Sequence, residues 1–337
     1  MSEPQSKTIV FLSPLPSSFL RSLLAPYLPR LGDVEIVSVA ESPREEVLEA
    51  LRRADVVVGD YTFRFKITRE ICDLMERCKL IAQPSTGYDH IDVEECARRG
   101  IPVSNAGGAN APSVAEWTIM AALVLLKRIL QAHAKTKSGE WPQWELMDAG
   151  TYDLYGKTWG IIGLGRIGRE VARRVRAFDA RIVYYDKRRL PPSEEERLGV
   201  KYVRLARLLR MSDIVSIHLP LTGETRGLLG ERELRSMKPT AVLINPSRGE
   251  IVDEQALARA LREGWIMGAA VDVYSREPPG RDHPLIALDH PNLLTTPHIA
   301  GANSDARARI IQATVENIVR VLMGGEPANV VNMPAER

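Results

Sequence analysis

Three charged or titratable residues each follow an apolar run in the second half of the sequence. Arg248 comes after "AVLINPS", Glu277 after "AAVDVYSR" and His298 after "LLTTP". An arginine presents a planar fork of N–H donors that pairs with a carboxylate, and it stays charged at any working pH. Taken singly, the three have ordinary interpretations as a solvated loop arginine, a surface carboxylate and a buried, hydrogen-bonded histidine. If the runs are parallel strands, however, the residues share the sheet edge where ligands bind in open α/β folds.

A glycine triplet lies between another apolar run and a helical pattern. The segment "TWGIIGLGRIGREVARRV" contains Gly163, Gly165 and Gly168, and Asp186 ends the next run, "RIVYYD". The offset is close to the roughly 20 residues typical of a dinucleotide site. Gly163 permits a tight turn, Gly165 lets the backbone approach a pyrophosphate, and Gly168 lets helix and strand pack closely. Because the helix N-terminus then faces the phosphates, the pattern predicts a dinucleotide cofactor.

The residue that ends the second run indicates which dinucleotide binds. Asp186 can accept hydrogen bonds from ribose hydroxyls and would repel a 2′-phosphate, which favours NAD over NADP. Lys187, Arg188 and Arg189 follow at once. They have two interpretations, a solvated basic turn or a site for that phosphate. We therefore expect NAD, with NADP use left open.

The elements that must position these residues follow a βαβ rhythm. In the first hundred residues, short β-branched runs alternate with helical stretches, and a second series begins after residue 157. The first series of runs comprises residues 8–12, 34–39, 55–59, 80–83 and 101–104. The second comprises residues 158–162, 181–185, 214–219, 241–244, 268–273 and 293–295. The rhythm predicts two α/β units.

Three helices are expected at particular places. One begins at "SPREE", with Ser42 as its cap and Glu45 completing a capping box. A long one runs from about Ser113 through "VAEWTIMAALVLLKRILQAHAKTK" and is followed by the aromatic loop "GEWPQWELMDAGTYDLYGK". The last has an apolar face at helical spacing, formed by Ile311, Val315, Ile318 and Leu322. Since no strand follows it, we expect this face to return and cover the first unit.

Composition limits the classes of partner. The chain has 337 residues, enough for two domains, and 45 Lys and Arg nearly balance 43 Asp and Glu. We therefore expect a small-molecule partner rather than nucleic acid or a membrane. The longest apolar run, residues 119–126, is far below the about 20 residues that span a bilayer. The start, "MSEPQSKTIVFLS", lacks the features of a secretory signal, so a cytoplasmic location is expected. The cysteines, Cys72, Cys78 and Cys96, match no metal or redox spacing, and no metal site is expected.

The ordered motifs resemble one enzyme family. They are "GLGRIG", Asp186, "HLPLTGETRGLL", "INPSRGEIVDEQALARAL", "GAAVDVYSREPP" and "HPLIALDHPNLLTTPHIAG". This set is similar to the D-isomer-specific 2-hydroxyacid dehydrogenases, nearest their glyoxylate/hydroxypyruvate reductase branch. "STGYDHID" resembles the family's substrate loop and "NAPSVAEWTIM" its interdomain helix. The resemblance thus extends over nearly the whole chain.

The resemblance implies an α/β fold of two Rossmann-like, doubly wound parallel-sheet domains. A flavodoxin-like substrate domain would comprise residues 1–105, completed by residues 300–337. Residues 106–299 would form the NAD(P)-binding Rossmann domain, which includes a dimerisation arm at 113–150. The expected assembly is a homodimer.

The resemblance also implies residue roles. Arg248 would hold the 2-oxo acid and polarise its carbonyl, while backbone amides around Thr86 and Gly87 grip the carboxylate. His298 would protonate the forming alkoxide during reduction and act as the base during oxidation. Glu277 would favour the imidazolium through its opposite charge. The other expected positions are Arg166, Ile167, His218, Pro220, Thr225, Asn245 and Asp272 for the cofactor, Asp272 at the nicotinamide carboxamide, and Ser85 and Asn110 for the substrate.

The particular 2-oxo acid is indicated by two loops. "QPSTGYDH" has no Arg or Lys at its centre, which argues against a phosphorylated substrate, and "GEWPQWEL" resembles the arm of the reductase branch. We expect glyoxylate or hydroxypyruvate, reduced to the D-alcohol where a stereocentre forms. D-3-phosphoglycerate and D-lactate dehydrogenases are the alternatives. In the reductase branch an aromatic residue of this loop approaches the site of the partner subunit, and Trp141 and Trp144 have a second interpretation as packing for a dimer arm. An NAD-sensing corepressor and an enzyme that oxidises a one-carbon or small inorganic acid with NAD are further options, which a turnover assay separates.

Overall fold

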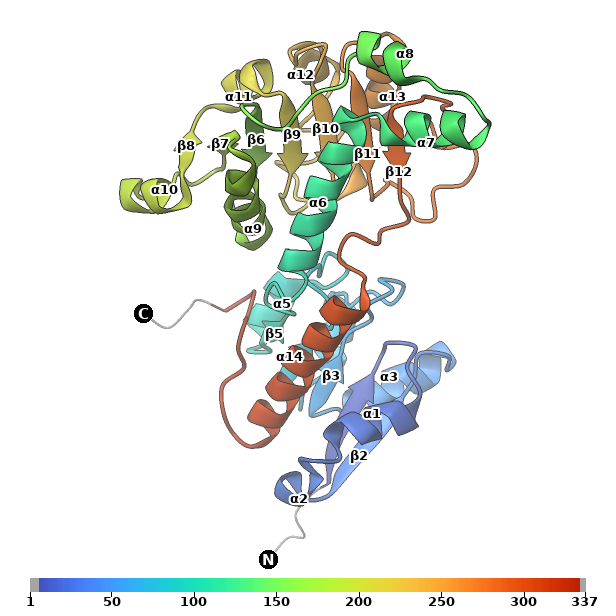
Figure 1. Ribbon diagram of the computed structural model, residues 1–337. Helices are drawn as coiled ribbons and strands as arrows, with labels where there is room; N and C mark the ends of the chain where they lie inside the picture. The colour runs from blue at the N-terminus through green and yellow to red at the C-terminus, as the bar shows by residue number, and fades with distance from the viewer. Residues whose placement is uncertain (1–5, 334–337) are drawn as a thin grey trace, which may run out of the picture. The chain divides into compact units, whose positions relative to one another are not determined.

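The computed structural model describes residues 6–333, which divide into two compact units (Figure 1). The first unit comprises Met1–Asn110 and Ser304–Arg337, and the second comprises Ala111–Asn303. The breaks lie a few residues beyond the boundaries expected at 105/106 and 299/300. Residues 1–5 of the stretch inspected for a secretory signal, and residues 334–337 of the tail, lie outside the described range.

The first unit contains a five-stranded sheet in the order β2-β1-β3-β4-β5, with every neighbouring pair parallel. Its strands are β1 (Lys7–Phe11), β2 (Val34–Ser38), β3 (Val56–Val58), β4 (Leu80–Ala82) and β5 (Val103–Ser104). This is the strand order of flavodoxin-like folds, and the chain order reverses between β1 and β3.

Helices cover both faces of that sheet. They are α1 (Ser17–Leu24), α2 (Leu28–Leu31), α3 (Arg44–Arg52), α4 (Arg69–Leu74), α5 (Val93–Arg98) and α14 (Ser304–Leu322). One buried cluster joins the sheet to α3, α4 and α5, and the other joins it to α1, α2 and α14. Ile318 and Leu322 of α14 are buried there, so the last helix packs on the first unit, as its apolar spacing predicts.

The second unit contains a seven-stranded parallel sheet in the order β12-β11-β10-β9-β6-β7-β8. Its strands are β6 (Thr158–Ile162), β7 (Arg181–Tyr185), β8 (Val200–Tyr202), β9 (Ile214–Ile217), β10 (Val242–Asn245), β11 (Gly268–Val271) and β12 (Leu293–Thr295). The order reverses between β6 and β9, as in a Rossmann fold, and a crevice for ligands lies at such a reversal. The two sheets confirm the expected fold class.

Helices also cover both faces of this second sheet. They are α6 (Ala111–Leu126), α7 (Ile129–Lys137), α8 (Gln143–Asp148), α9 (Arg166–Val175), α10 (Pro192–Leu198), α11 (Leu205–Met211), α12 (Glu231–Arg235) and α13 (Glu254–Arg262), with short 3₁₀ turns at Arg176–Phe178 and Gly249–Ile251. One face packs against α6 and α9, the other against α11, α12 and α13. Burial on both sides explains why most of these strands are continuous apolar runs.

The predicted N-cap of α3, Ser42, is wrong. The helix begins at Arg44, its N-cap is Pro43 with ψ 151°, and no side chain caps it. Because Pro43 already takes the extended conformation of an N-cap, Ser42 lies outside the helix, where it cannot reach the first free amides. Glu45 is then the second helical residue, so the expected capping box does not form.

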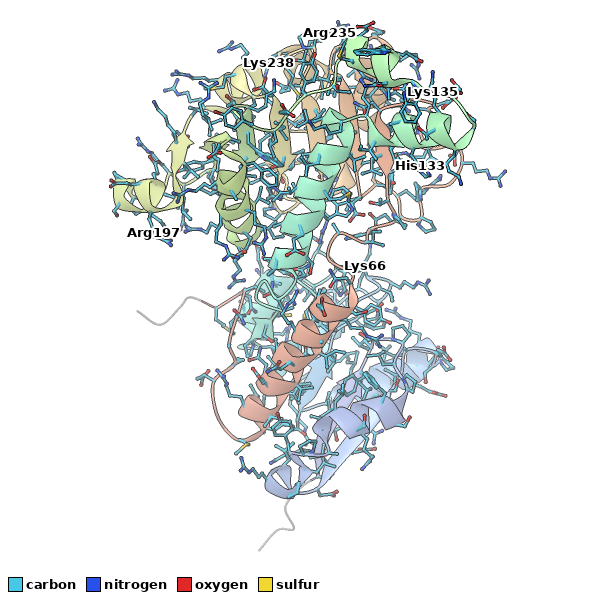
Figure 2. The ribbon with its side chains drawn as sticks, in the orientation of Figure 1. Lys66, His133, Lys135, Arg197, Arg235 and Lys238 are labelled. Atoms are coloured by element: carbon cyan, nitrogen blue, oxygen red, sulfur yellow. The ribbon has the colours of Figure 1, made fainter. Side chains whose placement is uncertain are left out.

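The single long helix expected from Ser113 is two helices. Arg128 adopts φ 50°, a left-handed conformation that ends α6 before α7 begins. Its guanidinium donates to the carbonyl oxygens of Gly150 and Ala149, at 3.0 and 2.7 Å, which holds the break in place. The aromatic loop that follows contains a further helix, α8. Nζ of Lys135 on α7 lies 2.7 Å from Oε1 of Glu145 on α8, and this ion pair joins the two helices. Figure 2 shows Lys135 and His133 projecting from α7.

The apolar length of α6 serves the core of its own unit. Eleven of its residues are buried, among them Ala115 and Leu125, which pack against the sheet. The exposed apolar side chains of the expected arm come mainly from the segments after it: Ile129, Leu130, Trp141, Trp144 and Met147. Within residues 6–333, no helix is long and apolar enough to cross a membrane.

Candidate active site

The glycine loop between β6 and α9 has the geometry that a dinucleotide requires. Gly163 adopts φ +93°, and a Cβ there would lie 2.7 Å from the carbonyl oxygen of His218. A Cβ on Gly168 would collide with the carbonyl of Gly163, whereas a Cβ on Gly165 would meet nothing within 4 Å. The outer glycines are thus required by the fold, and the space beside Gly165 is open, as the close approach of a pyrophosphate would require. Arg166 and Ile167 form the first turn of α9.

Asp186 lies at the end of β7 against this loop. Its Oδ2 accepts a hydrogen bond from the Leu164 amide at 2.8 Å, which fixes the carboxylate beside the glycines. Two of the basic residues that follow are paired: Lys187 with Glu224 at 2.8 Å, and Arg189 with Glu195 at 2.8 Å. The charges next to Asp186 are therefore partly neutralised by neighbouring carboxylates.

The expected cofactor residues that follow β9, and Asn245 at the end of β10, also lie at the carboxyl edge of the sheet. Nε2 of His218 lies 3.0 Å from Ser216 Oγ, and burial lowers the pKa of His218 to about 3, so the ring is neutral. The hydroxyl of Thr225 donates to the Pro220 carbonyl at 2.7 Å and closes the turn after β9. Asn245 is buried, and its amide donates to the Arg248 carbonyl at 2.9 Å.

Asp272 holds the turn that carries His298. The carboxylate is fully buried and accepts hydrogen bonds from the Thr296 hydroxyl and from the amides of Ile299 and Ala300, the last two at 2.8 Å. Burial raises the pKa of Asp272, although these bonds oppose the shift. His298 itself adopts φ +56°, a conformation that non-glycine residues seldom take and that clusters at functional sites. The Asp272 bonds on both sides stabilise this turn.

The structure brings Glu277 and His298 into contact. Nδ1 of His298 lies 2.7 Å from Oε2 of Glu277, whose Oε1 accepts the Tyr274 amide at 3.0 Å. Burial alone would raise the pKa of the Glu277 carboxyl, but the hydrogen bond and charge of His298, the Tyr274 amide and the charge of Arg248 hold it below its usual value. Since Glu277 is bonded to Nδ1, Nε2 is the ring nitrogen left to exchange a proton with a ligand.

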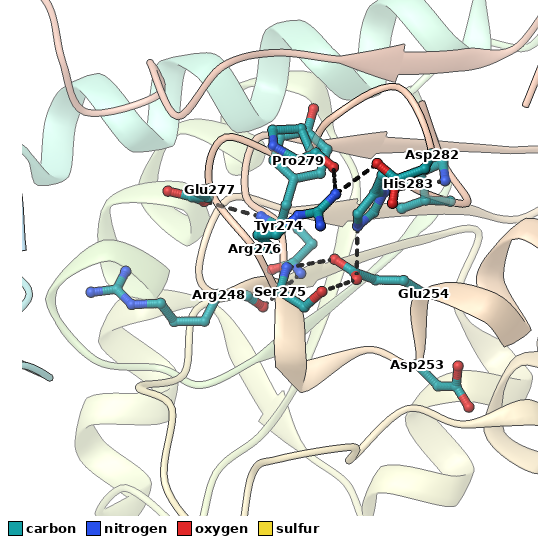
Figure 3. Close-up of polar contacts among 12 residues, drawn as sticks. Arg248, Asp253, Glu254, Tyr274, Ser275, Arg276, Glu277, Pro279, Asp282 and His283 are labelled. Atoms are coloured by element: carbon teal, nitrogen blue, oxygen red, sulfur yellow. Dashed lines mark hydrogen bonds and ion pairs between the residues drawn. The ribbon is translucent and has the colours of Figure 1, made fainter. Parts of the chain in front are cut away.

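Arg248 lies in the loop after β10, as its sequence position predicts. One guanidinium nitrogen donates to the neighbouring Ser247 carbonyl at 2.8 Å. In Figure 3 the side chains of Arg248 and Glu277 project in the same direction from neighbouring loops. The second unit therefore carries the Arg248 guanidinium and a carboxylate-paired imidazole on the sheet edge that also carries the glycine loop.

Of the expected substrate residues, Ser85, Thr86 and Gly87 follow β4, and Asn110 lies after β5, where it contacts Thr86. Ser85 accepts from Gln83 Nε2 at 2.8 Å and donates to the Gly87 carbonyl at 2.7 Å. The Thr86 hydroxyl donates to Asn110 at 2.6 Å. The loop is therefore fixed by its own side chains. In residues 6–333 no cluster of three His, Cys, Asp or Glu side chains is placed to hold a metal.

Three residues around this site were not predicted: Glu254, Tyr274 and His283. Tyr274 belongs to the loop that carries Glu277 and binds this carboxylate with its amide. Glu254 contacts the loop at Ser275 and is also bonded to His283, as Figure 3 shows. Nothing in the local sequence marks them, because Glu254 and His283 are separated by 29 residues and meet only in the folded unit.

A Rossmann unit with this glycine loop and a histidine–carboxylate pair on the same edge defines an NAD(P)-dependent oxidoreductase. Residues 119–300 match the family model "D-isomer specific 2-hydroxyacid dehydrogenase, NAD binding domain". The chain belongs to this family, whose members act on CH–OH donors, and it binds NAD(P).

Curated relatives and solved structures support the same assignment. A glyoxylate reductase from Thermococcus litoralis is 42% identical over 295 residues, 86% of this chain and 87% of that protein. A glyoxylate reductase from Korarchaeum cryptofilum is 40% identical, with 87% of each chain covered. The crystal structure of a glyoxylate reductase from Paecilomyes thermophila is 30% identical with a TM-score of 0.86, covering 97% of this chain and 99% of that one.

Proposed function

We propose that the protein reduces a small 2-oxo acid, of the glyoxylate or hydroxypyruvate type, to the D-2-hydroxy acid with NADH. The observation that carries this proposal is the contact of His298 with Glu277 at 2.7 Å on the edge that also presents Arg248. The names of the glyoxylate reductases that resemble the chain agree with it.

In this proposal each residue has one role. The cofactor supplies hydride to the carbonyl carbon when it is bound. Arg248 pairs with the substrate carboxylate and polarises the carbonyl, because its fork of donors reaches both groups. Nε2 of His298 gives its proton to the oxygen that gains charge, so the imidazolium becomes neutral and the product is an alcohol. Glu277 stabilises that imidazolium before transfer.

The loop of the first unit supplies the remaining substrate contacts. Backbone amides of Thr86 and Gly87 bind the carboxylate, and Ser85 and Asn110 hold the loop through the hydrogen bonds described above. Arg166, Ile167, His218, Pro220, Thr225, Asn245 and Asp272 complete the cofactor site. Asp186 accepts the ribose hydroxyls, which favours NAD over NADP because a 2′-phosphate would meet its negative charge.

A panel of 2-oxo acids tests the proposal. Glyoxylate, hydroxypyruvate, pyruvate and 3-phosphohydroxypyruvate are compared by kcat/KM with NADH. Glyoxylate or hydroxypyruvate is expected to give the highest value, and a higher value for 3-phosphohydroxypyruvate would refute the assignment. Absence of turnover with every acid would favour a binding protein that senses NAD.

The second candidate function is D-3-phosphoglycerate dehydrogenase. A protein of that name from Methanocaldococcus jannaschii is 39% identical over 308 residues, which cover 91% of this chain but 57% of that protein. The same panel decides between the two, because the phosphorylated acid would then be the best substrate.

A further inference from the structure

A buried side-chain pair lies behind the loop that carries Glu277. Glu254 is the first residue of α13, and His283 follows the same loop. Nε2 of His283 lies 2.9 Å from Oε2 of Glu254, and the two side chains are only 4% and 10% exposed. A carboxylate is rarely buried without a partner, so this contact has a structural or functional reason. The proposed function gives neither residue a role.

The hydrogen bond at Nδ1 of His283 indicates which ring nitrogen carries the proton. Nδ1 accepts a hydrogen bond from the Leu285 amide at 3.3 Å, so it keeps its lone pair. Nε2 therefore carries the proton and donates a hydrogen bond to Glu254. The ring also packs edge-on against Tyr274, with centroids 5.3 Å apart and an interplanar angle of 86°. His283 thus fixes both the Glu254 carboxylate and the Tyr274 side chain.

Glu254 in turn accepts two hydrogen bonds from Ser275. Its Oε1 accepts the Ser275 amide at 2.8 Å, and its Oε2 accepts the Ser275 hydroxyl at 2.5 Å, as the dashed lines in Figure 3 show. Gly249 packs against the same segment, because a Cβ there would collide with the backbone of Tyr274 and Ser275. The backbone at residues 274 and 275 is therefore held by contacts with Glu254 and Gly249.

The preceding amide of this segment is the one that binds Glu277. Tyr274 N donates to Glu277 Oε1 at 3.0 Å, and Glu277 Oε2 lies 2.7 Å from His298 Nδ1. The Tyr274 hydroxyl donates to the Thr296 carbonyl at 3.1 Å, two residues before His298. Two carboxylates, Glu254 and Glu277, thus bind the amides of consecutive residues. A shift of this segment would move Glu277 relative to the imidazole.

We propose that Glu254 and His283 are positioning residues, which hold residues 274 and 275 so that Glu277 stays bonded to Nδ1 of His298. The inference rests on the proposed function, since it needs His298 to be the proton donor. Hydrogen bonds weaken steeply with distance and misalignment, so a small displacement of the loop weakens the hold on the imidazolium. The other charged or titratable groups that act on Glu277 and His298 are Arg248, Asp272 and the Tyr274 phenol.

A double-mutant cycle on Glu254→Gln and Glu277→Gln tests this positioning role. The pH dependence of kcat/KM for reduction is measured with NADH and the best acid of the panel. Glu277→Gln is expected to lower the pH at which reduction fails by about 1 unit, because the imidazolium loses its carboxylate and gives up its proton earlier. Glu254→Gln is expected to lower this pH by about half as much, since the Glu277 carboxylate is still present but is displaced from the imidazolium.

The double variant gives the decisive result. If Glu254 acts through Glu277, adding Glu254→Gln to Glu277→Gln produces no further shift. A further shift of the same size would overturn the inference, because Glu254 would then act independently. If Glu277→Gln moves the profile and Glu254→Gln does not, the inference fails while the proposed function stands. If Glu277→Gln itself leaves the profile unmoved, the proposed role of Glu277 fails, and the inference fails with it.

Two comparisons separate positioning from loss of stability. Glu231→Gln is the matched control, because Glu231 pairs with Arg235 and Arg259 beside α13 but does not touch the loop. It is expected to leave the pH profile unchanged. His283→Gln keeps a neutral donor toward Glu254 and is expected to behave nearly like the parent, whereas His283→Ala should shift the profile as Glu254→Gln does. Equal shifts for both His283 variants, at equal thermal stability, would also overturn the proposal.

Discussion

Asp186 accepts the Leu164 amide with Oδ2 at 2.8 Å and the Arg188 amide with Oδ1 at 3.3 Å, and we propose that the carboxylate also accepts the ribose hydroxyls of the dinucleotide. Asp186→Ala removes both a charge and an acceptor, so it is expected to reduce the preference for NADH over NADPH by about tenfold. The ratio of kcat/KM values for the two cofactors measures this. An unaltered ratio would show that Asp186 does not contact the ribose.

His298 contacts the reacting oxygen in the proposed mechanism, and it lies on a different loop from the glycines. His298→Ala is therefore expected to lower kcat by on the order of 100-fold or more while NADH binding stays nearly unchanged. Steady-state rates and a fluorescence titration with NADH give the two quantities. A comparable loss of NADH affinity would mean that the residue supports the cofactor site instead.

At the scale of the element, the loop between β6 and α9 allows cofactor contact to be separated from stability. Gly165→Ala meets nothing within 4 Å. It is expected to weaken NADH binding with little change in thermal unfolding. Gly163→Ala must adopt φ +93° and meet the His218 carbonyl, so we expect a loss of about 1 to 3 kcal/mol in the free energy of unfolding.

Gly264 provides the matched control for the loop variants. It adopts φ +70° in open space, so Gly264→Ala carries the conformational strain without the collision. It should destabilise less than Gly163→Ala and leave NADH binding unchanged. Should Gly165→Ala bind NADH as the parent does, the backbone at that glycine does not approach the pyrophosphate.

Apolar and β-branched runs predict the places of most strands, and for three strands they also predict both ends. The runs at 158–162, 181–185 and 293–295 match β6, β7 and β12 at both ends. β8 was missed because it has three residues at the sheet edge, only one of them buried, and thus no apolar run. The break before α7 was missed because helix-forming residues continue through Arg128, and the carbonyl groups that hold its turn come from residues 149 and 150.

The candidate site was predictable to a similar degree. Arg248, Glu277 and His298 each follow a strand, so parallel pairing alone brings them to one edge, and the structure adds the bond between Glu277 and His298. The support behind that pair was not predictable. Glu254 and His283 carry no local signal, and their contact depends on how α13 packs against the loop after β11.

At the scale of the whole molecule, the exposed aromatic and aliphatic side chains after α6 support the proposal of a homodimer. Trp141 and Trp144 are 79% and 65% exposed, and such apolar surface typically marks an interface. Sedimentation at micromolar concentration should give twice the mass of one chain. Ile129→Glu is expected to reduce that mass to one chain, whereas Phe178→Glu, outside the arm, should not. A parent protein that sediments as a monomer would contradict the proposal.

Because α14 packs on the first sheet, the core of the first unit is completely synthesised later than the core of the second unit. The second unit is one continuous segment, so its whole core has been synthesised once residue 303 is out. The first unit begins earlier in the chain, and α1 and α2 cover part of one face of its sheet, but the rest of that face stays uncovered until Ile318 and Leu322 of α14 have been made. The unit whose synthesis starts first is therefore the unit whose core is completed last. Until then the part of the sheet that α14 covers is exposed, and a chaperone would have this apolar surface to protect.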